Sequence, residues 1–180
     1  MNVQTIINKY YPEDNELKRI YLSHSKSVAD FALSLVDRNT NLQLDRTFVY
    51  EAAMLHDLGI FLTHAPAIYC VGSNPYICHG YLGAELLLKE GYPAHALVSE
   101  RHTGTGISLA MIRKQHLPLP LRELQPVSNE EQLICFADKF FSKTKLGKMK
   151  TQEKIVLSLS KYGQESVDRF LAWNALFLHA

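Results

Sequence analysis

Residues 50–60 read YEAAMLHDLGI, an apolar stretch that ends in a His-Asp pair followed by Leu-Gly. The pattern predicts a helix that stops near Gly59, because glycine readily takes the left-handed conformation found after helix ends. A buried carboxylate needs a partner, and a divalent metal bound by imidazole and carboxylate is one solution. Neighbouring residues point about 100° apart on a helix, so His56 and Asp57 share one ion only if the turn distorts. A cap or a neutral buried pair is the alternative.

The composition of the 180-residue chain predicts one globular domain, with 47% hydrophobic and 21% charged residues. A net charge of +1 gives no signal for nucleic-acid binding. The three cysteines, Cys70, Cys78 and Cys135, have no CxxC spacing and suit reduced thiols. No signal-peptide core begins the chain, and no apolar run approaches about 18 residues. We therefore expect a cytoplasmic protein without a membrane segment.

Helical periodicity organises the N-terminal part of the chain. Residues 3–10 form an expected short helix, and Asn15 is expected to cap a longer one that runs to about Asp37. Apolar residues recur at steps of three and four in this longer helix, and His24 falls on their inward stripe. An inward histidine is more often a packed core residue than a ligand. Asp45 is the expected cap of the helix that leads to His56.

The middle of the chain alternates irregular segments with short helices. Residues 61–78 form an irregular loop of the kind that often carries function, with His64 at its surface. His79 begins a helix that Gly91 closes, where a histidine can also act simply as an N-terminal cap.

A further short helix begins at Pro93 and ends at His102. The Thr-Gly-Thr-Gly loop after it offers backbone N–H groups to an anion, which is weak evidence alone. His95 and His116 lack a comparable setting and are expected at the surface.

The C-terminal part begins with a proline-punctuated linker at residues 117–129. Ser128 or Asn129 then begins a helix on which Asp138 faces inward, where an arginine, a cap or a metal would satisfy it. Amphipathic helices follow at about 151–161 and 164–178. No segment alternates with period two, so we expect no sheet. The prediction is a single all-α domain over residues 1–180.

Six inward polar residues on separate segments share the chemistry of metal ligands. They are His24, His56, Asp57, His79, His102 and Asp138. Six ligands with two carboxylates exceed what one metal with an open position needs. They suit two ions about 3.5–4 Å apart, bridged by Asp57, an arrangement fit for phosphoryl chemistry.

The order H…HD…H…H…D of these residues resembles the HD superfamily of metal-dependent phosphohydrolases and spans roughly residues 20–145. Residues 55–59, LHDLG, are similar to its HDIG signature, and residues 79–86, HGYLGAEL, resemble the H-x-x-x-G-A helix of its dinuclear branch. The segments 101–104 (RHTG) and 136–139 (FADK) also look like family segments. The chain resembles small stand-alone HDIG proteins and bacterial diiron hydrolases of symmetrical dinucleoside tetraphosphates.

The resemblance implies a single HD-domain helical bundle, with additional C-terminal helices at about 151–178. It also implies two divalent metal ions, iron or manganese first, with magnesium, nickel or zinc as alternatives. One ion would be held by His24, His56, Asp57 and Asp138. The second would be held by His79 and His102, with Asp57 as the bridge.

Two departures from the family pattern bear on the substrate. Many HDIG proteins have a lysine after the glycine, where this chain has Ile60, so Lys139, Arg101 or Lys26 would have to supply that charge. The sequence Gly-Tyr-Pro at residues 91–93 lies upstream of His102 and no His-His pair follows it. The chain is therefore not expected to be a cyclic-di-GMP phosphodiesterase of the HD-GYP kind.

The expected activity is hydrolysis of a phosphate ester or anhydride in a phosphorylated small molecule, a nucleotide in the first instance. Two ions would make a bridging hydroxide available for in-line attack on phosphorus, and Asp57 would orient it. Lys139 and Arg101, each next to a ligand, would hold substrate charge, although a solvated helix face explains both equally well. A homo-oligomer is compatible with the sequence.

Two other classes of function use the same residues. A diiron HD-type oxygenase would have these ligands and would consume oxygen. A non-catalytic nucleotide or metal sensor would bind tightly without turnover, although such a module has no need of two open metal sites.

Overall fold

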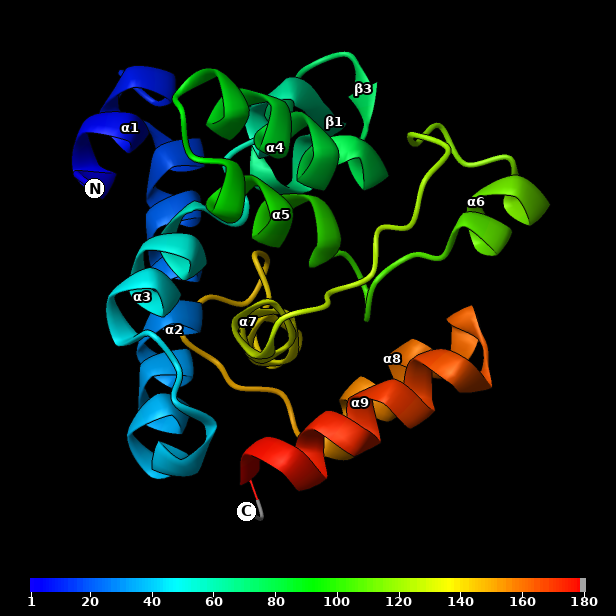
Figure 1. Cartoon of the computed structure of the whole chain (residues 1–180). Coiled ribbons are helices and arrows are strands. Elements are labelled where there is room, and N and C mark those ends of the chain that lie inside the picture. The colour runs from blue at the N-terminus through cyan, green and yellow to red at the C-terminus, as the bar shows by residue number, and fades with distance from the viewer. Residues whose placement is uncertain (179–180) are drawn as a thin grey trace.

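The computed structural model describes residues 1–178 and consists mainly of helices (Figure 1). The α-helices are α1 (Val3–Tyr10), α2 (Glu16–Arg38), α3 (Arg46–Leu55), α4 (His79–Lys89), α5 (Pro93–Arg101), α6 (Leu109–Gln115), α7 (Asn129–Lys139), α8 (Gln152–Leu159) and α9 (Gln164–Leu178). The all-α class is confirmed. Among the described residues, no helix is both long and apolar enough to cross a membrane.

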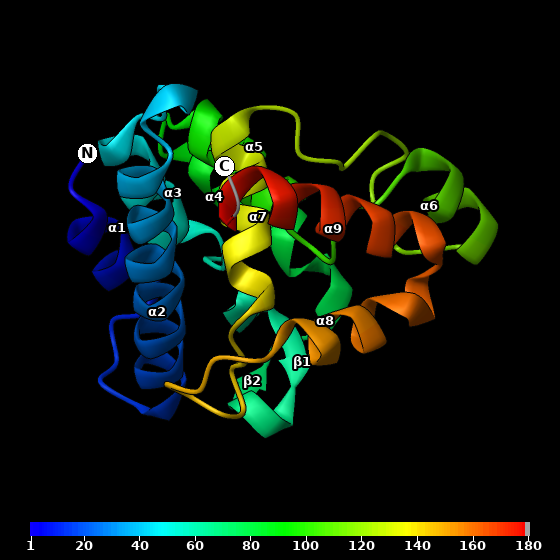
Figure 2. The same ribbon diagram turned by 90° about the horizontal axis from the view of Figure 1, so that it is seen from below.

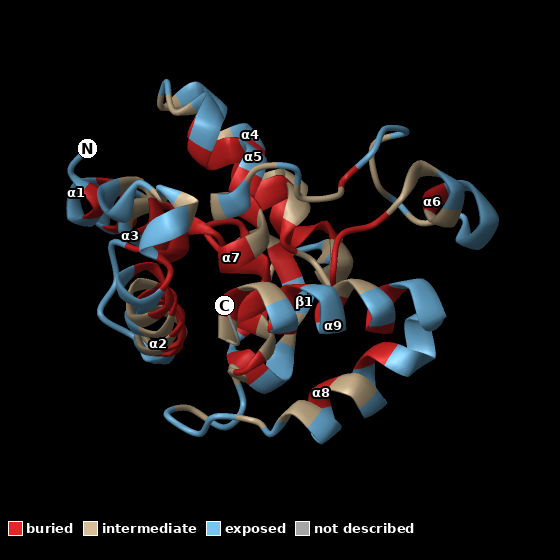
Figure 3. Cartoon of the chain, turned by 60° about the horizontal axis from the view of Figure 1, so that its bottom comes forward, coloured by how far each residue is buried: buried red, intermediate tan, exposed pale blue. Residues whose placement is uncertain are grey.

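Helix α7 is the centre of the bundle. It is seen end-on in Figure 1, with α2 and α3 on one side, α5 above and α9 below. The side chains from Leu133 to Ala137 are completely buried, so the middle of this helix is apolar all round, as expected of a helix segment in the core. Buried residues gather around it, whereas exposed residues lie on the outer faces of the surrounding helices (Figure 3). Asp138, near the end of α7, therefore projects from the core itself.

Side-chain caps fix where the helices begin. The Asn15 side chain accepts a hydrogen bond from the Lys18 backbone N–H (3.0 Å), and that of Asp45 accepts one from Thr47 (2.9 Å). Ser128 caps α7 in the same way. Each such cap is worth about 1 kcal/mol. All three caps were predicted from the sequence.

A small sheet lies between α3 and α4, and the expectation of no sheet was wrong there. Its strands are β1 (Thr63–Ala65), β2 (Cys70–Val71) and β3 (Asn74–Pro75), in the order β2-β1-β3. β2 pairs with β1 antiparallel and β3 pairs with it parallel. Strands of two or three residues are too short for alternation to show in the sequence.

Helix α6 was not predicted, because no element was assigned to the residues between the loop at 103–106 and the linker at 117–129. It stands away from the bundle (Figures 1 and 2) with its own small core of Ile107, Ile112 and Leu124. Two backbone hydrogen bonds between Ile107 and Leu124 (2.9 and 3.0 Å) join the two ends of the segment that contains α6. An ion pair between Arg122 and Glu100 ties it to α5.

Gly59 is not in the left-handed conformation that the sequence suggested, because its φ is −84° and its ψ is 0°. A Cβ on this residue would instead collide with the backbone nitrogen of Gly83 and the carbonyl oxygen of His79. Glycine is therefore required here by close packing of the turn after α3 against α4. Gly91, with φ +83°, does close α4 in the expected way.

Candidate metal centre

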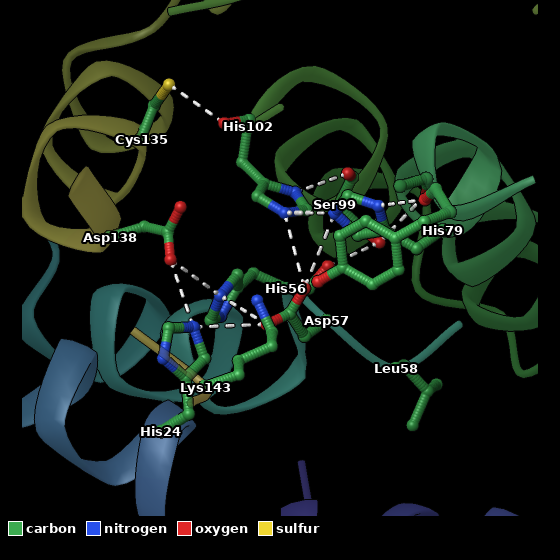
Figure 4. Close-up of polar contacts among 12 residues, drawn as sticks. His24, His56, Asp57, Leu58, His79, Ser99, His102, Cys135, Asp138 and Lys143 are labelled. Atoms are coloured by element: carbon green, nitrogen blue, oxygen red, sulfur yellow. Dashed lines mark hydrogen bonds and ion pairs between the residues drawn. The ribbon is translucent and has the colours of Figure 1, made fainter. Parts of the chain in front are cut away.

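The six histidines and aspartates that the sequence singled out lie together in the interior (Figure 4). His24 comes from α2, His56 and Asp57 follow the end of α3, and His79 begins α4. His102 follows the end of α5, and Asp138 projects from α7. The exposed fraction of each of these residues is at most 9%. Five separate segments therefore supply one polar cluster.

One half of the cluster joins the side chains from α2, α3 and α7. The distance from His24 Nε2 to Asp138 Oδ1 is 3.0 Å, and from His56 Nε2 to the same oxygen 3.6 Å. Both imidazole nitrogens lie 3.1 Å from Asp57 Oδ2. Two nitrogens and two carboxylate oxygens thus face a common point, a donor set that suits a divalent ion such as iron, manganese or zinc.

The other half joins α4 and α5. His79 Nε2 lies 3.0 Å from His102 Nε2, and each lies 3.5 Å from Asp57 Oδ1. The two oxygens of Asp57 therefore face different pairs of histidines. A carboxylate in this position is able to bridge two cations.

Backbone carbonyl groups fix the tautomers of three of the histidines. Nδ1 lies 2.6 Å from Ala53 O in His56, 2.7 Å from Tyr76 O in His79 and 2.7 Å from Ser99 O in His102. A carbonyl oxygen can only accept, so each Nδ1 carries the proton and donates it. In the neutral ring the Nε2 lone pair is then left pointing into the cluster, the usual orientation of a metal-bound histidine.

Several buried nitrogen and oxygen atoms of the cluster have no hydrogen-bond partner, and a bound cation would satisfy them. Among the described residues, His24 Nε2, His56 Nε2 and Asp57 Oδ1 are buried without a hydrogen-bond partner. Buried polar atoms without hydrogen-bond partners are costly, and neutral His Nε2 and carboxylate oxygens are natural ligands of divalent metals. Two sets of three residues each bring their ligand atoms within 4.8 Å of one another: His24, His56 and Asp138, and His56, Asp57 and His102.

The pKa shifts in the cluster follow from burial and from the neighbouring charges. Burial opposes ionisation of Asp57, but Lys143 and His56 hold the pKa of this carboxyl well below its usual range. Burial likewise opposes the charged form of His56, yet the carboxylates of Asp57 and Asp138 raise its pKa to about 9. Burial and the neighbouring His102 lower the pKa of His79 to about 3, so this ring stays neutral, the form that binds metals.

Two lysines lie against the cluster. Lys139, which the sequence analysis selected, places Nζ 2.8 Å from Asp138 Oδ2 and donates to the carbonyl oxygen of His102 (3.3 Å). Lys143 places Nζ 2.6 Å from Asp57 Oδ2, and sequence reasoning missed it. It lies in the loop after α7, among other lysines, and nothing in the sequence distinguishes it from its exposed neighbours Lys145 and Lys148.

The other two candidate cations have partners elsewhere. Arg101 Nη1 lies 2.9 Å from the Glu131 carboxylate at the start of α7. Lys26 pairs with Asp30 on the exposed face of α2 (2.7 Å). Neither residue forms an ion pair with a member of the cluster within residues 1–178.

The remaining histidines lie outside the cluster. His64 and His116 are exposed, as expected. The prediction that His95 lies at the surface was wrong, because only 9% of it is exposed. Its ring packs edge-on against Phe48 at 4.7 Å, and its Nε2 lies 3.3 Å from Glu51 Oε2. His95 is thus a packing residue with a carboxylate partner.

Two cavities adjoin the cluster and share three lining residues, Tyr76, Gly104 and Tyr162. The apolar cavity, of about 250 Å³, lies beside His79 and is lined by residues such as Ile77, Ile107 and Met111. The lysine cavity, of about 510 Å³, is lined by Asp138, Lys139, Lys143 and Lys150. One ligand at the shared edge would therefore reach both the polar cluster and an apolar surface.

Comparison with known proteins identifies a family and several relatives of this chain. The HD domain family matches residues 21–142. An uncharacterised protein of Methanocaldococcus jannaschii is 32% identical over 127 residues, which cover 69% of this chain and 68% of that protein. A tRNA (cytidine(56)-2′-O)-methyltransferase of Picrophilus torridus is 28% identical over 152 residues, which cover 79% of this chain but only 40% of the relative.

A solved structure shares the fold. The HD domain of the Listeria monocytogenes phosphodiesterase PgpH superposes with a TM-score of 0.56 and 20% identity, covering 97% of this chain and 86% of that one. The family match extends over more than half of the chain and spans every member of the polar cluster. This chain therefore belongs to the HD domain family.

Proposed function

We propose that the chain is a metal-dependent phosphohydrolase that cleaves a phosphate ester or anhydride of a nucleotide. Membership of the HD domain family supports the hydrolase class. The single observation that carries the proposal is the position of Asp57, whose two oxygens face two different pairs of histidines. A dinuclear centre is the arrangement that uses all of these groups at once.

The ligands divide as the two halves of the cluster do. His24, His56, Asp57 and Asp138 would hold one divalent ion, and His79 and His102 would hold a second with Asp57 between them. Iron or manganese suits these mixed nitrogen and oxygen ligands. Such ions, when bound, lower the pKa of water and neutralise charge on phosphoryl oxygens.

The residues of the chain itself orient and neutralise the substrate. Neutral His79 and His102, with Nδ1 held by backbone carbonyls, cannot turn their Nε2 atoms out of the cluster without losing those hydrogen bonds. Lys139 and Lys143 place ammonium groups at the edge where a phosphoryl group would lie. Fixed cations of this kind stabilise the charge that develops on transferred phosphoryl oxygens.

The apolar cavity supports an organic group on the substrate. Tyr76 stacks on His79 with ring centroids 4.7 Å apart, which places an aromatic wall directly beside the cluster. Tyr162 and Met111 complete a cavity that is mostly apolar and too small for a large ligand. A nucleobase with its phosphate at the shared edge of the two cavities fits this division into polar and apolar halves.

The direct test is turnover by protein loaded with Fe(II) or Mn(II). A panel of nucleoside mono-, di- and triphosphates and dinucleotides is offered with and without oxygen, and phosphate release is measured. We expect hydrolysis that does not require oxygen and that the Asp57→Asn variant loses. Absence of turnover of every phosphorylated compound by fully loaded protein would overturn the proposal, and oxygen-dependent activity would replace it with the oxygenase reading.

A further inference from the structure

The lysine cavity carries more positive charge than the metal centre accounts for. Three lysines line it, Lys139, Lys143 and Lys150, against one acidic residue, Asp138. Of these lysines, only Lys139 is marked by its position in the sequence, next to Asp138. Lys143 and Lys150 belong to the segment between α7 and α8.

The three lysines differ in what neutralises them. Lys139 pairs with Asp138 (2.8 Å), and Lys143 pairs with Asp57 (2.6 Å). Lys150 donates only to a neutral group, the carbonyl oxygen of Lys139 (3.1 Å), and forms no ion pair within the described part of the chain. Burial lowers the pKa of Lys150, the nearby carboxylate of Asp138 partly offsets this effect, and the charges of Lys139 and Lys143 lower the pKa further. Its ammonium group therefore lies close to two others, and the negative group that acts on it, Asp138, is already paired with Lys139.

Metal binding would increase this excess of positive charge. Asp57 and Asp138, the carboxylates that neutralise Lys143 and Lys139, are also candidate metal ligands. A carboxylate shared with a divalent cation neutralises a lysine less completely, because its charge is divided between them. An anionic ligand in the lysine cavity is the group that would balance the three ammonium groups.

The position of Lys150 is fixed by the backbone. Its N–H donates to the carbonyl oxygen of Phe140 (2.7 Å), which closes the loop after α7. Its ammonium group is held against the end of α7 by the bond to Lys139. By contrast, Lys148 lies exposed on the same loop. The lysine cavity, at about 510 Å³, is also within the usual size range of small-molecule sites.

We propose that Lys143 and Lys150 form a phosphate subsite beside the metal centre that selects ligands with at least two linked phosphate groups. One phosphate group lies at the metal ligands, and Lys150 pairs with the next. The proposal rests on the phosphohydrolase function and adds a preference for anhydrides over simple phosphate monoesters. Charge-assisted hydrogen bonds from ammonium to phosphate are strong enough to produce such a preference.

The test measures binding without turnover. Imidodiphosphate, a diphosphate with N–H in place of the bridging oxygen, and orthophosphate are titrated calorimetrically into Mn(II)-loaded protein with excess Mn(II) present. The variants are Lys150→Met, Lys150→Arg and, as the matched control from the same loop, Lys148→Met. Circular dichroism and metal content establish that each variant is folded and loaded.

We expect Lys150→Met to weaken imidodiphosphate binding about ten-fold while orthophosphate binding changes less than about two-fold. Lys150→Arg restores most of the loss because it keeps the charge, and Lys148→Met changes neither ligand appreciably. Lys143→Met also weakens the binding of imidodiphosphate. Its metal content is measured in parallel, because this lysine contacts Asp57. Equal losses for both ligands, or equal losses in Lys150→Met and Lys148→Met, would overturn the subsite.

The outcome is independent of turnover by the wild-type protein. A selective effect of Lys150→Met in a protein that hydrolyses nothing would support the subsite and reject the phosphohydrolase function. Hydrolysis of nucleotides with no selective effect of Lys150→Met would reject the subsite and leave the function standing.

Discussion

Gly59 and Gly83 pack backbone against backbone, so that a Cβ on Gly83 would lie 2.9 Å from the nitrogen of Gly59. A Cβ on Gly59 would collide with Gly83 in turn. This contact presses α4, which begins with His79, against the turn that carries His56 and Asp57. The separation between the two halves of the polar cluster therefore depends on the absence of a side chain at both glycines.

The substitution Gly59→Ala is expected to destabilise the fold by about 2 kcal/mol or more, because backbone atoms cannot move aside as side chains can. The control is Gly147→Ala, where φ is +69° but no atom lies within 4 Å of the added Cβ. That change meets only local strain, about 1 kcal/mol. Urea unfolding measures both, and equal losses would show that the close approach is not the constraint.

Metal stoichiometry is expected to follow the two halves of the cluster. We expect about two ions per wild-type chain, about one in His79→Gln, and almost none in Asp57→Asn, because Asp57 contacts both halves. His95→Gln is the control, since His95 is buried outside the cluster. Elemental analysis and the melting temperature before and after chelation check this, because metal bound only by the folded state raises stability. Equal metal loss in His79→Gln and Asp57→Asn would contradict the bridging position.

Filling the apolar cavity is expected to reduce affinity for nucleotides selectively. Met111→Trp would occupy the space beside His79 and raise KM for a nucleotide several-fold, while KM for glycerol phosphate changes little. Ala110→Trp is the control, since this neighbour on α6 is exposed. Steady-state kinetics with both substrates measures the difference. An equal rise in KM for both substrates would place the organic group elsewhere.

Stability is expected to fall in alkaline solution because of the buried thiols. Burial raises the pKa of Cys135 from its ordinary 9.0 to about 12, and that of Cys70 to about 11. The folded state thus binds these protons more tightly than the unfolded state. The resulting stabilisation is complete below about pH 9 and is lost as the pH rises through the window from 9 towards 12. Urea midpoints between about pH 8 and 10.5 measure the slope.

The variant Cys135→Ala tests the origin of this slope. It is expected to lower stability at neutral pH, because the thiol fills space in the core, yet to lose stability less steeply as the pH rises. Cys78→Ala is the comparison, since Cys78 donates to the carbonyl oxygen of Pro118 (3.3 Å) and burial raises its pKa by less. The same slope in wild type and Cys135→Ala would assign the alkaline loss to other groups.

The helices and their caps could be predicted because the signals are local. His24 lies on the buried face of α2 because the spacing of its apolar neighbours determines that face. Asn15 and Asp45 cap helices through bonds to residues two or three positions further on. The six candidate ligands also emerged together, since each lies on an inward face or at the end of a helix.

The predictions from the sequence that were wrong or missing concern contacts between residues far apart in the chain. The sequence suggests that Gly59 is a glycine because of a turn, but glycine is required there because the backbone of Gly83 in α4 leaves no room for a Cβ. His95 is buried because Phe48 and Glu51 on α3 cover it, which its own neighbours in sequence do not reveal. Lys143 reaches Asp57 from a loop in which several lysines look alike. Local patterns carry no information about such pairs.

Two histidines of the polar cluster also satisfy backbone carbonyl groups at the ends of helices. Carbonyl groups in the last turn of a helix have no partner within it, and His56 and His102 donate to such groups at the ends of α3 and α5. Because each Nδ1–H is hydrogen-bonded to a rigid backbone carbonyl, the orientation of the imidazole ring is fixed as well. The rings are consequently oriented by the folded backbone itself, so we expect addition and removal of a metal ion to leave the backbone of this region unchanged.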